Sequence, residues 1–176
     1  MANYIRQYLR NFRVTGSIVP SSRFLTRKML KPVDFSKAKV IVELGSGDGC
    51  MTKKILAKMR KDAKLYAIEL QSDFVKMLKA IDDKRLVVIQ DTAERTHSLT
   101  PKADYIISGL PLTSLPKRVG ENIIQSVLKT LKPNGSYIQF QYTLISYKKF
   151  KELFSDVKLS FTPLNFPPAF VYACTK

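Results

Sequence analysis

Short apolar runs alternate with amphipathic segments along the chain. The apolar runs are rich in Val, Ile, Leu and Tyr and are bounded by glycine, proline or charged residues, as is typical of buried strands. The predicted strands are residues 40–44, 64–69, 85–90, 103–108, 136–142, 157–162 and 169–175. The segments between most of them carry apolar residues at helical spacing. The predicted helices are residues 2–13, 23–30, 50–59, 72–80, 116–131 and 146–154.

The order of these elements predicts an α/β fold. Strands that alternate with helices form a parallel sheet that is covered on both faces. No helix is predicted between the last two strands, so these should pair antiparallel as a hairpin. We therefore expect a Rossmann-like, doubly wound sheet of seven strands with one antiparallel edge strand. Residues 33–176 would form this domain, and residues 1–32 a helical extension that faces a membrane or a substrate.

The charge of the chain is strongly positive. It has 30 Lys and Arg against 14 Asp and Glu, a formal net charge of +16. Residues 1–40 hold nine of the basic residues and one acid, so they carry +8, half of the excess. Such a charge indicates a polyanionic partner, either nucleic acid or an anionic membrane surface.

The predicted helix at residues 2–13 could provide part of this contact. Its apolar positions share one face, and Arg6, Arg10 and Arg13 lie in a row beside that face. A basic helix of this kind suits a membrane interface, although it could equally pack on its own domain.

Other compositional features indicate a cytoplasmic protein. Cys50 and Cys174 lie far apart and suggest no disulfide framework, which fits a reducing compartment. The sequence has no signal-peptide pattern and no apolar run long enough to span a bilayer. It has no cluster of His, Cys and Asp at metal-ligand spacing, so no metal is expected. We expect a monomer.

The candidate chemistry begins at a glycine loop. Glu43, Gly45, Gly47 and Gly49 follow the first buried strand in the pattern E-x-G-x-G-x-G. This spacing differs from the dinucleotide fingerprint G-x-G-x-x-G. It resembles motif I of the class I S-adenosylmethionine-dependent methyltransferases, which implies S-adenosylmethionine as the cofactor.

Two further acids strengthen this resemblance. Glu69 ends the second strand, twenty residues after Gly49, where a ribose-binding acid is expected. Asp91 follows the third strand, where the resembled family holds the adenine amino group. The residues expected to bind the cofactor are Glu43, Gly45, Ser46, Gly47, Gly49, Glu69, Leu70, Asp91, Thr92, Ser108 and Gly109.

Three kinds of function remain open for such a cofactor-binding chain. It could methylate a lipid, methylate a nucleic acid, or bind the cofactor or a membrane without catalysis. Methyltransferases of adenine amino groups have Asn/Asp-x-Pro-aromatic after the fourth strand, and the aromatic ring stacks on a flipped base. This chain resembles the ribosomal RNA adenine dimethyltransferases in motif I, but it has Ser108 in place of the carboxamide and Leu112 in place of the ring.

A second resemblance covers nearly the whole chain. Residues 16–22, 43–49, 108–116, 140–142 and 164–169 resemble the bacterial phosphatidylethanolamine N-methyltransferases. This implies stepwise N-methylation of phosphatidylethanolamine by a protein at the inner membrane face, with nucleic acid a less favoured partner. In that family the G-S-I-x-P-S-S stretch lies at the cofactor and acceptor site. The implied substrate-binding residues are Ser17, Ile18, Pro20, Ser21, Ser22, Leu110, Pro111 and Tyr142.

Methyl transfer to an amine also needs a proton acceptor, because ethanolamine is mostly an ammonium ion at neutral pH. Tyr142, at the end of the fifth strand, is one candidate. Tyr4 is the other, if the amino-terminal helix folds over the site. Alignment of the nitrogen with the methyl group and the sulfur, together with desolvation, would supply much of the rate.

Overall fold

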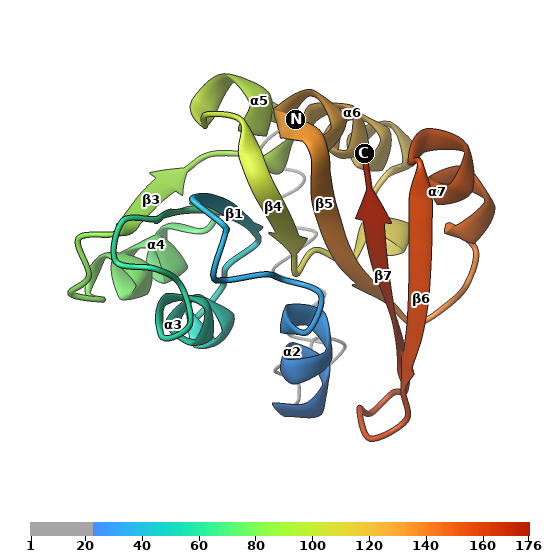
Figure 1. Cartoon of the computed structure of the whole chain (residues 1–176), viewed down its shortest axis with the longest axis horizontal. Helices are drawn as coiled ribbons and strands as arrows, with labels where there is room; N and C mark the ends of the chain where they lie inside the picture. The colour runs from blue at the N-terminus through green and yellow to red at the C-terminus, as the bar shows by residue number, and fades with distance from the viewer. Residues whose placement is uncertain (1–22) are drawn as a thin grey trace.

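The computed structural model describes residues 23–176, and a single sheet crosses the whole of that part (Figure 1). The strands are β1 (Val40–Leu44), β2 (Lys64–Glu69), β3 (Leu86–Gln90), β4 (Ala103–Ser108), β5 (Leu131–Gln141), β6 (Asp156–Thr162) and β7 (Ala169–Thr175). Their order across the sheet is β3-β2-β1-β4-β5-β7-β6. The first five strands are mutually parallel, and β7 is antiparallel to both of its neighbours.

This topology confirms the predicted seven-stranded doubly wound sheet with an antiparallel strand at its edge region. The reversed strand is β7, which lies between β5 and β6. The two closing strands form the expected hairpin, with Thr162 opposite Ala169.

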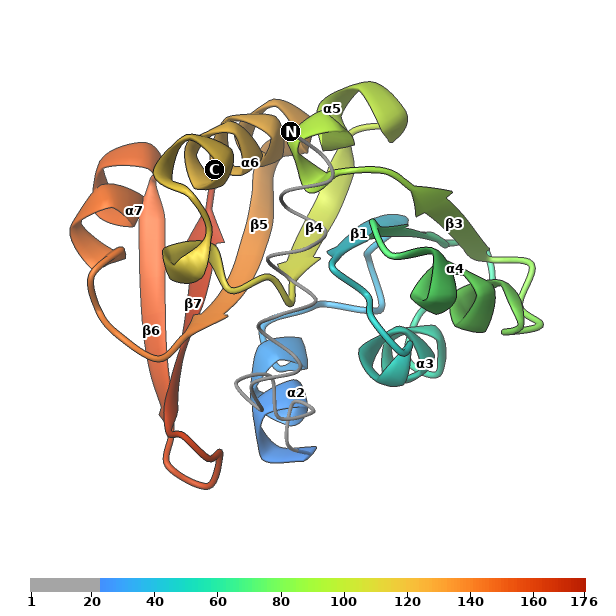
Figure 2. The ribbon, with the colours of Figure 1, turned by 180° about the vertical axis from the view of Figure 1, so that it is seen from behind.

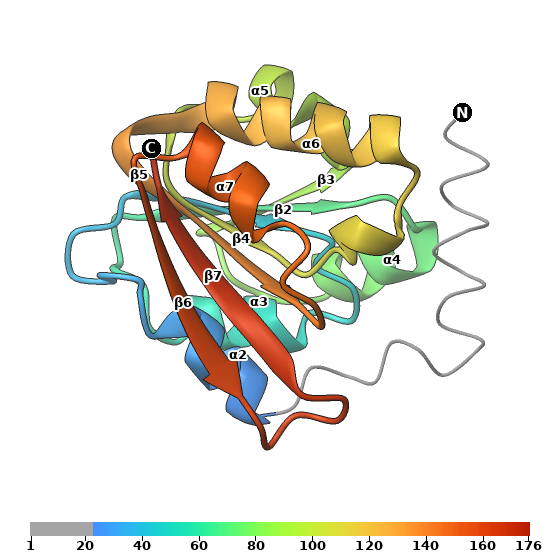
Figure 3. The same ribbon diagram turned by 90° about the vertical axis from the view of Figure 1, so that its right-hand side faces the viewer.

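Helices cover both faces of the sheet (Figure 3). They are α2 (Arg23–Leu30), α3 (Cys50–Leu56), α4 (Ser72–Lys79), α5 (Thr96–Leu99), α6 (Lys117–Thr130) and α7 (Tyr147–Leu153). The first three lie on one face and the last three on the other. Each face has its own buried cluster, one built with α2 and α3 and the other with α6 and α7.

Several boundaries differ from the predicted ones. Helix α3 ends at Leu56, because the Lys58 N–H bonds the Ile55 carbonyl and the tightened turn brings Met59 into the core. Strand β5 begins at Leu131, which pairs with Ala103 before the register shifts. Short helices at Thr96–Leu99, Ala93–Arg95 and Leu112–Ser114 were not predicted.

Helix α2 belongs to the packed structure of the protein. Leu25 and Met29 are spaced i, i+4 and are completely buried against the face of the sheet that also holds Ile138 and Val171. Burial of each side chain contributes about 1.5–3 kcal/mol, which anchors α2. The division into an extension of residues 1–32 and a domain of residues 33–176 stays a prediction.

Two other observations bear on the amino-terminal segment and on membranes. The predicted helix at residues 2–13 lies outside the described residues. Among residues 23–176, no helix has both the length and the apolar character needed to cross a membrane.

Candidate active site

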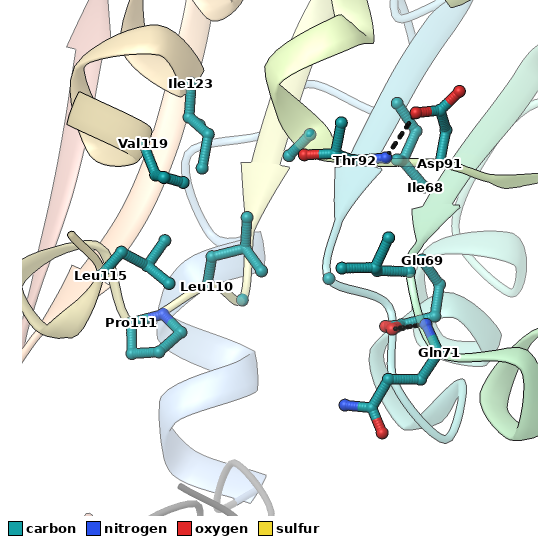
Figure 4. Close-up of a pocket in the computed structure, with 14 residues that line it drawn as sticks. Ile68, Glu69, Gln71, Asp91, Thr92, Leu110, Pro111, Leu115, Val119 and Ile123 are labelled. Atoms are coloured by element: carbon teal, nitrogen blue, oxygen red, sulfur yellow. Dashed lines mark hydrogen bonds between the residues drawn. The ribbon is translucent and has the colours of Figure 1, made fainter. Parts of the chain in front are cut away.

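A pocket lies at the carboxyl ends of the parallel strands (Figure 4). The chain moves from β1 outward to β3 and then returns to β4 on the other side of β1, which makes β1/β4 the point where the strand order reverses. Open α/β sheets bind ligands at such a point. The lining comes from the loops after β1, β2, β3 and β4 and from the start of α6: Gly45, Ile68, Glu69, Leu70, Gln71, Asp91, Thr92, Ala93, Gly109, Leu110, Pro111, Leu115, Val119 and Ile123.

The polar side of the pocket is centred on Glu69. One of its carboxylate oxygens accepts a hydrogen bond from the Gly47 N–H at 2.9 Å, and the other accepts from the Gln71 N–H at 2.9 Å. These bonds fix the carboxylate between the glycine loop and α4. Each oxygen keeps a further lone pair, which is what binding of two neighbouring hydroxyl groups requires.

The glycine loop has the backbone geometry that its sequence predicts. Gly45, Gly47 and Gly49 have φ values of 70°, 56° and 80°, in the left-handed region that favours glycine. At Gly45 there is also no room for a side chain, since a Cβ atom would lie 2.5 Å from Leu110 Cδ2. The loop after β1 and the loop after β4 are therefore in direct contact.

Glu43 and Ser46 lie behind this loop and are buried. Glu43 accepts a hydrogen bond from the Thr52 hydroxyl at 2.6 Å through one oxygen. Its other oxygen and the Ser46 hydroxyl have no partner within residues 23–176. Burial raises the pKa of Glu43 to about 8, against the lowering effect of the hydrogen bond from Thr52.

Asp91 and Thr92 form the outer part of the polar side. Asp91 accepts from the Thr92 N–H at 2.7 Å, and its second oxygen pairs with Arg95 at 2.8 Å. The Arg95 side chain is 60% exposed, so this ion pair contributes little to stability. Asp91 can thus turn toward a ligand at small cost.

The opposite side of the pocket is apolar (Figure 4). Val119 and Ile123 are spaced i, i+4 on α6, and Leu115 lies just before this helix; all three line the pocket. None of them was predicted as a site residue, although Val119 and Ile123 lie in the predicted helix at residues 116–131. Ile68, Gln71 and Ala93 also line the pocket and were not predicted.

The residues of the loop after β4 lie in two environments, the pocket and the core. Gly109, Leu110 and Pro111 line the pocket as predicted. Ser108 is fully buried, and its hydroxyl accepts from the Leu110 N–H at 3.3 Å. Leu112 is buried in the core on the α6 side and does not reach the pocket.

Tyr142 lies elsewhere on the same edge of the sheet. It follows β5, packs against Phe140 on the α2 side with ring centroids 5.6 Å apart, and does not line the pocket. Burial raises the pKa of its phenol, and the neighbouring Asn165 side chain offsets part of that rise. Tyr142 is therefore neutral at pH 7, able to accept a hydrogen bond from an amine but poorly suited to remove its proton.

The remaining predicted site residues are in the amino-terminal segment. Tyr4, Arg6, Arg10, Arg13, Ser17, Ile18, Pro20, Ser21 and Ser22 lie outside the described residues. Their assignments stay predictions.

The fold and this pocket define a class I S-adenosylmethionine-dependent methyltransferase. The family model for ribosomal RNA adenine dimethylase matches residues 2–152. An ornithine lipid N-methyltransferase from Singulisphaera acidiphila is 30% identical to this chain in an alignment 179 residues long. The alignment covers 97% of this chain and 93% of that protein. Ribosomal RNA small subunit methyltransferase A of Mycoplasma mycoides is 34% identical over 94 residues, 49% of this chain and 34% of that protein.

Solved structures share the fold at low sequence identity. Precorrin-6y C5,15-methyltransferase from Geobacter metallireducens has a TM-score of 0.69 at 16% identity, covering 85% of this chain and 86% of that one. Human N-acetylserotonin methyltransferase, in complex with S-adenosylmethionine, has a TM-score of 0.66 at 14% identity. The match covers 86% of this chain and 51% of that one. The chain belongs to the ribosomal RNA adenine dimethylase family of S-adenosylmethionine-dependent methyltransferases.

The residues of the pocket fit this cofactor. Glu69 and Asp91 both line the pocket. Glu69 would hold the ribose hydroxyls of a bound cofactor, and Asp91 would contact its adenine amino group. Glu43 and Ser46 are buried behind the glycine loop and do not line this pocket, so their expected contact with the cofactor stays a prediction. The apolar stripe on α6 can cover the adenine face. When bound, the cofactor supplies a methyl group on a sulfonium, and the chain has to align an acceptor with that group.

Proposed function

We propose that this protein methylates the amine of a phospholipid headgroup, phosphatidylethanolamine, at the inner face of the membrane. The product would carry one to three methyl groups. The similarity to an ornithine lipid N-methyltransferase over almost the whole chain supports an amine-bearing lipid as the acceptor. The sequence resemblance to phosphatidylethanolamine N-methyltransferases supports the particular headgroup.

The loop after β4 is the observation that carries this proposal. Recognition of a flipped adenine needs a carboxamide and an aromatic ring at this loop. Counted back from Pro111, the carboxamide position of this motif is Gly109 and not Ser108, to which the sequence analysis assigned it. Gly109 lines the pocket but has no side chain to accept from a base, and Leu112 is directed into the core instead of the pocket.

The lining of the pocket supports the same conclusion. None of the residues of the described part of the chain that line it is aromatic. The cofactor would fill most of this pocket, so an acceptor base would meet it only at the loop after β4, where Leu110 and Pro111 offer no aromatic ring. Base stacking on aromatic rings typically contributes about 1–3 kcal/mol. A small aliphatic amine needs no such surface.

Methylation of ribosomal RNA adenine is the second candidate. The family model and the partial match to a ribosomal RNA methyltransferase favour it, and a net charge of +16 would suit RNA. It requires the acceptor base to be recognised without a carboxamide at Gly109 and without an aromatic ring at Leu112.

One experiment separates the two candidates. The protein is incubated with cofactor labelled in its methyl group, in the presence of phosphatidylethanolamine vesicles and of ribosomal RNA. Lipids are then resolved by chromatography and RNA by digestion to nucleosides. We expect label in mono- and dimethylated phosphatidylethanolamine. Label in dimethyladenosine without label in lipid would refute the proposal, and label in neither would indicate a non-catalytic protein.

A further inference from the structure

A second, larger hollow lies on the α2 side of the sheet. Helices α2 and α3 form it together with residues 161–164 at the end of the β6–β7 hairpin, and its volume is about 770 Å³. We call it the basic groove. Figures 1 and 2 show α2 beside the tip of this hairpin from opposite sides. A volume of this size is sufficient for a drug-sized or headgroup-sized ligand.

Among residues 23–176, the basic groove is lined by several cations and by no acid. Its charged residues are Arg23, Arg27, Lys28, Lys31, Lys54 and Lys58. None of the six forms an ion pair with an acid of residues 23–176, whereas eight other basic residues in that range do. Residues 1–22 contain no Asp or Glu, so their side chains cannot neutralise the groove either. The groove therefore favours an anionic partner from outside the chain.

Large apolar side chains are exposed beside these cations. Phe24 on α2 is 54% exposed, and Leu164 and Phe166 at the hairpin tip are 67% and 85% exposed. Exposed apolar groups rimmed by basic residues are typical of proteins that lie at a membrane interface. The rings of Phe24 and Phe166 suit a bilayer or a base, whereas the aliphatic Leu164 suits only a bilayer, and we therefore favour a lipid surface over a nucleic acid.

The position of the hairpin connects this surface to the active site. Gln141 at the end of β5 pairs with Phe170, and Thr162 pairs with Ala169. Residues 163–168 therefore lie at the same edge of the sheet as the loop after β4, which lines the cofactor pocket. Asn165 in this tip interacts with the side chain of Tyr142. A bilayer bound at the groove would therefore lie beside this edge of the sheet, where an acceptor has to enter to reach the cofactor.

We propose that the basic groove binds the phosphates of anionic phospholipids while Phe24, Leu164 and Phe166 enter the outer part of the bilayer. This docking surface deepens the proposed function and rests on it for its biological purpose. Phosphate groups contact the lysines and arginines that lie on α2 and α3 and just after them. The apolar tip fixes the protein so that its carboxyl edge faces the headgroups.

The first variant of the test removes charge from the groove. Lys31→Gln, Lys54→Gln and Lys58→Gln are combined in the full chain. The control combines Lys79→Gln, Lys84→Gln and Lys129→Gln, which are exposed on other elements and remove the same charge. Binding is measured by co-sedimentation with phosphatidylglycerol-containing vesicles and with phosphatidylcholine vesicles across a salt series.

We expect the groove variant to bind anionic vesicles about a hundredfold more weakly than wild type at low salt, since each lysine near an anionic surface contributes about fivefold. The control variant should lose much less of its affinity for anionic vesicles. The difference should shrink at high salt because screening weakens the wild type as well. Equal losses in the groove variant and the control would overturn the proposal.

The second variant removes the apolar contact. Leu164→Ser with Phe166→Ser should weaken vesicle binding at high salt, where the charge contribution is small, and should leave binding to a structured RNA unchanged. If this variant binds vesicles like wild type while the groove variant loses RNA binding, the groove is an RNA site and the proposal is wrong.

Activity separates this proposal from the proposed function. The groove variant should methylate a water-soluble, short-chain phosphatidylethanolamine at the wild-type rate, because that substrate needs no docking. A wild-type protein that binds anionic vesicles through the groove but methylates no lipid would refute the proposed function alone.

Discussion

Replacement of Glu43 by glutamine should make the protein more stable at neutral pH. The Glu43 carboxyl is 1% exposed, and burial raises its pKa from 4.5 to about 8. Between these values the folded protein binds one more proton at this site than the unfolded chain. Stability therefore falls as the pH rises through this window, by about 1.4 kcal/mol per pH unit. Below pH 4.5 ionisation of Glu43 costs the folded protein no stability, and above pH 8 the loss of stability is complete.

Glutamine keeps the shape of the side chain and can still accept the hydrogen bond from Thr52. Glutamine does not titrate, so the variant does not lose stability through ionisation at this position. The free energy of unfolding of Glu43→Gln minus that of wild type should rise by about 3 kcal/mol between pH 5 and pH 7. Glu152→Gln, at an exposed position, is the control and should follow wild type.

The assay is urea unfolding of cofactor-free protein at a series of pH values from 5 to 8. Other titrating groups cancel, because only the difference between the two proteins at each pH is used. A difference that stays constant over this range would refute a neutral Glu43 in the folded protein. It would also mean that the carboxylate has a partner that residues 23–176 do not provide.

Three further predictions concern binding and catalysis. Glu69→Ala should lower the affinity for S-adenosylmethionine about ten- to hundredfold, since polar groups lose their partner; calorimetry that finds wild-type affinity would exclude Glu69 from the site. Tyr142→Phe should lower kcat/KM for the lipid about tenfold without moving the pH profile, because its neutral phenol contributes a single hydrogen bond; a shifted profile would instead identify it as the proton acceptor. Combined substitution of Arg6, Arg10 and Arg13 by glutamine should weaken co-sedimentation with anionic vesicles about a hundredfold and leave cofactor affinity unchanged; wild-type sedimentation would exclude these arginines from docking.

The elements of the fold could be predicted because each strand is a continuous run in the sequence, and the central strands β1, β4 and β5 are largely buried. Residues 64–69, 103–108 and 169–175 form strands with the predicted bounds. Helix ends were less accurate, since they depend on tertiary contacts such as the burial of Met59 beyond α3. The insertion of β7 between β5 and β6 depends on pairing across the sheet, which a local pattern does not contain.

The polar side of the pocket could be predicted because it lies at strand ends. Glu69 and Asp91 each follow a predicted strand, and parallel strands bring such residues together. The apolar side comes from α6, whose position over the pocket depends on the crossover between β4 and β5. The basic groove joins residues more than a hundred positions apart, so no local pattern indicates it.

The choice of acceptor depends on the carboxyl edge beyond the cofactor pocket. Gln139 is fully buried and donates to the Leu110 carbonyl at 2.8 Å, while it accepts from the Tyr137 hydroxyl at 2.7 Å. These bonds fix the loop after β4 from the side of β5, so the loop cannot easily rearrange to present a ring to a base. On the far side of β5, Tyr142 contacts Asn165 in the hairpin tip, where the basic groove begins. The cofactor pocket and the docking surface are thus connected through β5, and we infer that an amine held at a membrane surface fits this edge better than an extruded base.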